Sequence, residues 1–95
     1  MENWSLIDQV ITQTEDTIAS DLDGEVVLAS ITNQKYYNLG DIGGEIWSKL
    51  SEPITVRQLI NELAAEYQVD YLKCEEDVIS FIDHLYKEKL VQVVV

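Results

Sequence analysis

The most reactive side chains in this sequence belong to its single cysteine, Cys74, and its single histidine, His84. A nucleophilic cysteine needs a base beside it, but these residues lie about ten positions apart on one predicted helix, nearly three turns from each other. One cysteine and one histidine also fall short of the four protein ligands of a structural zinc site. We therefore expect Cys74 to be a structural thiol and His84 a surface imidazole, with no catalytic residue, metal or cofactor.

Three other groups could in principle hold ions or nucleotides, and each has a simpler explanation. Asp21 and Asp23 resemble the start of a calcium loop, but the strand-like sequence that follows offers no closing carboxylate, which indicates a turn. The acidic run at 75–77 suits the positive N-terminus of a helix. The GDIGG segment at 40–44 lacks the lysine and the spacing of a nucleotide site. The sequence therefore does not favour an enzyme.

The charge of the chain limits its partners. Eighteen acidic and six basic side chains give a formal net charge of -12. Such a surface repels phosphate backbones and anionic headgroups, so we expect neither nucleic acid nor a membrane as partner. A basic or neutral peptide would be steered towards it, although solubility is the simpler reason for the charge.

The length of 95 residues suits one domain with a modest core. Its apolar runs are far shorter than the ~20 residues of a membrane-crossing helix. The start of the chain shows no signal-peptide pattern, and one cysteine cannot form an internal disulfide. We expect a cytoplasmic protein.

The segment from residue 19 to 39 predicts strands joined by tight turns. Asp21, Asp23 and Gly24 supply one hairpin turn, and a second falls at 32–34, where Asn33 tolerates a left-handed backbone. With a preceding strand at 12–20, this predicts a three-stranded antiparallel meander whose last strand is an exposed edge.

Three helices are predicted after the strands. Asp41 is placed to cap a helix at 42–50, within which two glycines indicate close approach of a neighbouring element. Thr55 with Gln58 has capping-box spacing and opens a helix that runs to about residue 67. Asp70 can cap a third helix at 71–89. The closing run at 90–95 is strand-like and could pair with the sheet or form a wing.

These elements predict an α+β fold, a winged helix-turn-helix-like arrangement with a three-stranded sheet followed by three helices. Residues 1–11 are expected to form a separate apolar segment, a short amphipathic helix or turn, ahead of a domain at 12–95. Winged helices usually read DNA through basic residues on the last helix, where this chain is mainly acidic. A DNA-binding regulator is therefore the weaker architectural alternative.

The order of DLDGEVVLASI, KYYNLGDIGGEIWSKL, TVRQLINELAAEYQVD, CEEDVISFIDHL and LVQV resembles the PqqD-like family. More narrowly, it is similar to the stand-alone recognition proteins of lasso-peptide biosynthesis. This resemblance implies a precursor-peptide recognition element, which binds the leader of a ribosomally made peptide and presents it to a processing enzyme. The implied partners are a precursor leader peptide and a transglutaminase-like leader peptidase or another maturation enzyme. The alternative within the family is a peptide chaperone for a radical enzyme.

The resemblance also implies a binding mode in which the leader adds as a strand and fills an apolar groove beside the third helix. Backbone pairing would run along the third strand, and the groove walls and one charged contact would come from the third helix. The implied site residues are Lys35, Tyr36, Tyr37, Asn38 and Leu39 on the strand, and Asp77, Val78, Phe81, Ile82 and Leu85 on the helix. Because strand side chains alternate, only one of the two tyrosines can face the groove.

Overall fold

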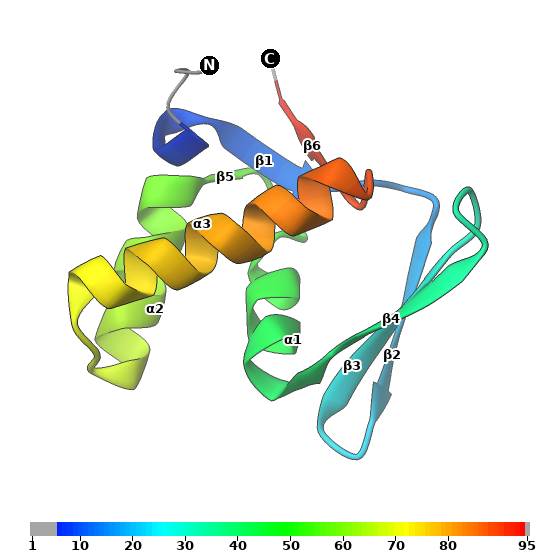
Figure 1. Cartoon of the computed structure of the whole chain (residues 1–95), viewed down its shortest axis with the longest axis horizontal. Coiled ribbons are helices and arrows are strands. Elements are labelled where there is room, and N and C mark those ends of the chain that lie inside the picture. Colours follow the sequence, from blue (N-terminus) through cyan, green and yellow to red (C-terminus); the bar gives the residue numbers. More distant parts are fainter. Residues whose placement is uncertain (1–5, 95) are drawn as a thin grey trace.

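Two three-stranded antiparallel sheets and three α-helices make up the fold in this computed structural model, which describes residues 6–94 (Figure 1). The first sheet has the order β2-β3-β4 and the second the order β5-β1-β6. The strands are β1 (Val10–Gln13), β2 (Thr17–Leu22), β3 (Glu25–Ser30), β4 (Lys35–Leu39), β5 (Ile54–Thr55) and β6 (Val91–Val93). The helices are α1 (Gly40–Lys49), α2 (Val56–Tyr67) and α3 (Tyr71–Lys87), with a 3-10 turn at Leu6–Asp8. The expected α+β class, with a three-stranded sheet followed by three helices, is confirmed.

The first hairpin turn forms as its residue types predict. Asp23 and Gly24 have φ values of 56° and 86°, and the Asp21 carboxylate accepts a hydrogen bond from the Gly24 amide at 3.0 Å. Successive left-handed residues match the twist of the flanking strands, so β2 and β3 pair without a slip from Thr17 opposite Ser30 to Leu22 opposite Glu25.

The second turn differs in detail from the prediction. Gln34, with φ of 55°, carries the left-handed conformation that the sequence assigned to Asn33. The Asn33 side chain instead donates hydrogen bonds to the Tyr37 hydroxyl at 3.0 Å and to the Glu88 carbonyl at 2.6 Å. The Asn33 side chain therefore links the turn to Tyr37 and Glu88, whereas the sequence predicted only that its backbone would form the turn.

The expected strand at 12–20 is wrong, because the chain breaks into two strands that belong to different sheets. β1 pairs with β5 and β6, and β2 starts only at Thr17. The Thr14 hydroxyl contacts the Leu90 carbonyl at 3.0 Å and the Thr17 hydroxyl at 3.1 Å in the intervening turn. Ile11 is fully buried in β1, so core packing fixes this first part of the chain.

In its described part, the segment at 1–11 forms a 3-10 turn at Leu6–Asp8 and the beginning of β1, so of the expected helix or turn it is the turn that forms. β1 crosses the expected boundary between residues 11 and 12. The part of this expectation that concerns residues 1–5 lies outside the described residues.

Helix α1 begins before the residue that was expected to cap it. The helix starts at Gly40, so Asp41 lies in its first turn and is not the cap. The Asn38 side chain accepts a hydrogen bond from the Gly40 amide at 2.8 Å, and Gly40 adopts φ of 72°. The close approach predicted at the glycines is confirmed, because a Cβ on Gly44 would collide with Val26 of β3.

The two later helices begin at the predicted caps. Thr55 accepts a hydrogen bond from the Gln58 amide at 3.1 Å, but the Gln58 side chain donates to Glu62 at 3.1 Å, so only one half of the capping box forms. Asp70 accepts from the Lys73 amide at 3.3 Å. Helix α3 ends at residue 87, two residues before the predicted end at 89.

The core lies where the helices meet the inner faces of both sheets. α1 packs on β3, and α2 packs on α3. The chain closes with β6, which pairs with β1 and leaves β4 untouched. The largest fully buried side chains come from every layer: Ile11, Leu28, Leu50, Val56, Leu59, Ile60, Ile82, Leu85 and Leu90.

Candidate functional site

Strand β4 is an edge strand. It pairs with β3 from Val27 opposite Asn38 to Ser30 opposite Lys35, and no strand within residues 6–94 pairs with its other side. An edge of this kind presents unpaired amides and carbonyls that can hydrogen-bond an extended peptide. The other edge of the sheet, β2, carries Asp21 on its helix-facing side, and such an inward charge opposes strand addition.

The two tyrosines of β4 point to opposite faces of the sheet. Tyr36 is 82% exposed, whereas Tyr37 is half-buried and packs against the core. The Tyr37 hydroxyl donates to the Glu88 carboxylate at 2.7 Å. Tyr37 is therefore the tyrosine on the helix side of the sheet.

The contacts of Tyr37 connect β4 to the end of α3. Asn33, in the turn before β4, bonds both Tyr37 and the backbone of Glu88. The hydrogen bond to Glu88 raises the pKa of Tyr37, and the same bond lowers the pKa of Glu88. Both directions favour a neutral phenol beside an ionised carboxylate, so the network holds the strand at a fixed distance from the helix.

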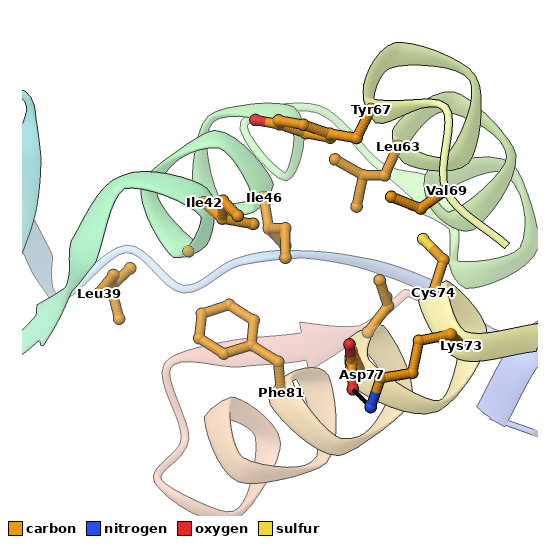
Figure 2. A pocket seen from close by; sticks show the side chains of 12 residues that line it. Leu39, Ile42, Ile46, Leu63, Tyr67, Val69, Lys73, Cys74, Asp77 and Phe81 are labelled. Atoms are coloured by element: carbon orange, nitrogen blue, oxygen red, sulfur yellow. Dashed lines mark ion pairs between the residues drawn. The ribbon is translucent and has the colours of Figure 1, made fainter. Parts of the chain in front are cut away.

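An apolar groove of about 470 Å³ opens between the C-terminal end of β4 and the helices (Figure 2). Leu39 and Phe81 lie at one end of it, and Val69 and Cys74 lie at the other. The lining comes from β4, all three helices and the α2–α3 connection: Leu39, Ile42, Gly43, Ile46, Leu63, Tyr67, Val69, Lys73, Cys74, Asp77, Val78 and Phe81.

The groove brings together some of the residues implied by the resemblance but not all of them. Leu39, Asp77, Val78 and Phe81 line it. Lys35, Tyr36, Tyr37 and Asn38 lie along β4 outside the groove lining. Ile82 and Leu85 do not line the groove, because both side chains are fully buried in the core.

Several groove residues lie outside the predicted site, and three of them are exposed apolar side chains. Ile42 is 55% exposed on α1, and Tyr67 and Val69 are 41% and 48% exposed at the end of α2 and just after it. The signal that could have found this wall is the glycine pair of α1. A Cβ on Gly43 would lie 3.1 Å from the Phe81 ring, so the glycine keeps α1 close to α3.

Charge at the groove is confined to one ion pair. Lys73 and Asp77 lie one turn apart on α3, with nitrogen and oxygen 3.2 Å apart, and both side chains are mostly exposed (Figure 2). Exposed pairs of this kind contribute little to stability, so either partner can exchange its contact for a charge on a ligand.

Cys74 lines the groove as a thiol. It is buried, its sulfur lies 3.9 Å from the Ile60 carbonyl, and burial raises its pKa. A raised pKa disfavours the thiolate, so the side chain contributes apolar surface. Within residues 6–94 no cluster of His, Cys, Asp or Glu could hold a metal ion, and no helix has the length and apolar character to cross a membrane.

Residues 25–91 match the family model described as coenzyme PQQ synthesis protein D (PqqD). The chain is a member of the PqqD family. The matched PqqD region runs from β3 to the start of β6, and so contains β4 and every residue of the groove. The resemblance predicted from the sequence is therefore confirmed.

A solved structure shares this architecture. The chain is similar to TbiB1 in complex with the TbiA(beta) leader peptide, with a TM-score of 0.79 and 27% sequence identity. The similarity covers 88% of this chain and 98% of that chain. No curated protein matches the chain significantly.

Proposed function

We propose that this PqqD-family chain is a non-enzymatic binding protein for the leader segment of a ribosomally synthesised precursor peptide. The observation that carries this proposal is an open edge strand, β4, that leads at Leu39 into an apolar groove. Similarity to TbiB1, whose structure contains a leader peptide, supports the same class of ligand.

The proposed binding mode is strand addition at β4. Main-chain hydrogen bonds along residues 35–39 supply affinity, and alternate leader side chains enter the groove and supply specificity. The contributing helix residues are Asp77, Val78 and Phe81, while Ile82 and Leu85 support them from the core beneath. A basic leader residue replaces Lys73 as the partner of Asp77.

We further propose that the bound leader is presented to a leader peptidase of the transglutaminase-like class, in the cytoplasm, during lasso-peptide maturation. The alternative is that the chain acts as a peptide chaperone and delivers its peptide to a radical enzyme. The genes beside the coding sequence separate the two: a transglutaminase-like protease with an asparagine-synthetase-like cyclase supports lasso assembly, and a radical enzyme supports the alternative.

Fluorescence anisotropy tests the binding step. A labelled leader from the adjacent precursor gene is expected to bind saturably in the micromolar range or tighter. The TbiA(beta) leader serves as a related probe, and a scrambled leader of equal composition serves as the control. A cognate leader that binds no better than its scrambled form contradicts the proposal.

Backbone methylation of the leader tests strand addition itself. Each methyl group removes one amide donor, and only every second amide of an added strand faces β4. Single methylations along the leader are therefore expected to weaken binding with a period of two residues. Equal losses at consecutive positions would contradict pairing with β4.

A further inference from the structure

The second sheet also ends in an open strand edge, at β6. The strand order β5-β1-β6 leaves one side of β6 unpaired within residues 6–94. On the paired side, the Val94 amide donates to the Val10 carbonyl of β1 at 2.8 Å. Main-chain groups alternate in direction along an antiparallel strand, so the amides and carbonyls of Val91 and Val93 point to the open side.

A cavity of about 520 Å³ lies against this open edge. Its lining includes the three consecutive strand residues Val91, Gln92 and Val93. Because successive strand side chains point to opposite faces, a cavity that touches all three lies along the edge of the strand. The end of α3 and the adjacent turns supply the rest of the lining: Thr14, Tyr86, Lys87 and Lys89. We call these seven residues the β6 site. It shares no lining residue with the apolar groove in the described part of the chain.

The charge of the β6 site is opposite to that of the chain as a whole. Two of the six basic residues of the sequence, Lys87 and Lys89, line it, and none of its described lining residues is acidic. Lys87 pairs with Asp83 at 3.0 Å, but both side chains are exposed, so the pair can open towards a ligand. An extended segment with Asp or Glu fits this site, because its main chain meets the open edge and its carboxylates meet the lysines.

A second copy of the chain fits the β6 site less well than an acidic segment does. A two-fold pairing of β6 with β6 would place both copies of Lys87 and Lys89 in one seam, where like charges repel. The occupant that matches the site is therefore a different chain with negative charge.

The β6 site lies next to the start of β4. Asn33, in the turn before β4, donates to the Glu88 carbonyl at 2.6 Å, and Glu88 lies between the two lysines of the site in the sequence. A leader strand that continues past Lys35 therefore leaves β4 beside the connection between α3 and β6. Once the leader is bound at β4, its flanking residues are held at a high effective concentration near the β6 site.

We propose that the β6 site binds an acidic segment of the same precursor peptide, on the flank of the leader strand that passes Lys35. This inference rests on the proposed leader binding and extends it from one contact to two. It narrows the substrate class to precursors in which Asp or Glu flanks the strand-adding segment.

Two ligands test the second contact by fluorescence anisotropy. One is the whole precursor encoded beside this gene, and the other is its shortest leader fragment that keeps the two-residue methylation pattern. The whole precursor is expected to bind about tenfold or more tightly than the fragment. Replacement of Asp and Glu in its flank by Asn and Gln is expected to remove this gain.

The variant Lys87→Gln with Lys89→Gln tests the site on the protein. It is expected to lower the affinity for the whole precursor towards that of the fragment, and to leave the fragment affinity unchanged. The matched control is Lys49→Gln with Arg57→Gln, which removes the same charge from side chains that line neither the groove nor the β6 site. Equal losses in the two double variants would reflect net charge alone and would overturn the site.

Hydrogen exchange at the Val93 amide gives a readout that needs no variant. This amide points to the open side of β6, so its exchange is expected to slow with the whole precursor and to stay unchanged with the fragment. Protection by the purified neighbouring peptidase, without protection by the precursor, would assign the edge to the enzyme and overturn the inference.

These measurements separate the possible failures. If the leader fragment does not bind, the proposed function fails before the β6 site is tested. If the fragment binds but the whole precursor binds no more tightly, the β6 site is overturned and the leader binding stands. The same conclusion follows if the precursor keeps its full affinity after its flanking carboxylates are replaced.

Discussion

Phe81 is the residue that joins the edge strand to the groove. Its half-buried ring lies between α3 and Leu39 at the end of β4 (Figure 2). We predict that Phe81→Ala weakens leader binding roughly tenfold to hundredfold, because an apolar contact of this size contributes about 1.5 to 3 kcal/mol. Anisotropy measures the effect, with Leu72→Ala on the same helix as control. Equal affinities of the two variants would remove Phe81 from the site.

A substitution at Gly43 is expected to affect leader affinity and the stability of the fold differently. A Cβ at this position would lie 3.1 Å from both the Leu39 Cβ and the Phe81 ring, at the floor of the groove. We predict that Gly43→Ala weakens leader binding while stability changes little, because a helix-propensity gain of up to roughly 1 kcal/mol offsets the crowding. Anisotropy and thermal melting measure the two quantities.

Gly44 provides the matched control for that experiment. A Cβ on Gly44 would collide with the Val26 side chain of β3, and neither residue lines the groove. Gly44→Ala is expected to destabilise the fold by about 1 to 3 kcal/mol through overpacking. A Gly43→Ala protein that loses as much stability as Gly44→Ala would show that both glycines serve only packing.

At the scale of elements, the Tyr37, Asn33 and Glu88 network fixes β4 relative to α3. We predict that Tyr37→Phe lowers the melting temperature by a few degrees, since it removes the hydroxyl at 2.7 Å from Glu88 but keeps the ring. Leader affinity should fall as well, because the hydrogen bond that holds β4 beside the end of α3 is lost. Tyr36→Phe is the control, because Tyr36 is 82% exposed on the opposite face.

The same network predicts a dependence of stability on pH. The pKa of Glu88 is lowered from its ordinary value of 4.5, so its contribution is complete above that value and is lost as pH falls through the folded pKa. The pKa of Tyr37 is raised from 10.0, so its contribution is complete below that value and is lost as pH rises through the folded pKa. Urea melts of wild type and Tyr37→Phe should therefore differ most between these limits and converge in acid. A constant difference down to pH 3 would contradict the sign.

At the scale of the whole molecule, the net charge of -12 governs how partners approach. We predict that the association rate of a basic leader falls as salt rises, while the dissociation rate changes less, because screening acts on long-range steering. Stopped-flow fluorescence over a salt series measures both rates. A leader with its lysines and arginines replaced by glutamine is the control and should show a flat dependence.

Much of the fold and part of the site follow from local sequence alone. The turn at Asp23 and Gly24 needs left-handed residues, and the caps at Thr55 and Asp70 satisfy orphan amides, so these elements form where the sequence places them. The third strand was likewise expected from local sequence, whereas the groove position of Phe81 was expected only from the resemblance to the PqqD-like family.

Only tertiary structure decided the rest. The split at 14–16 depends on the pairing of β1 with β5 and β6, and the Asn33 amide is drawn into contact with Glu88 from far along the chain. Ile82 and Leu85 face the core, and Ile42 and Tyr67 face the groove, because the packing of α1 against α3 determines which arc of each helix is covered. Local propensity determines where elements begin, whereas long-range packing determines which of their faces remain open to a ligand.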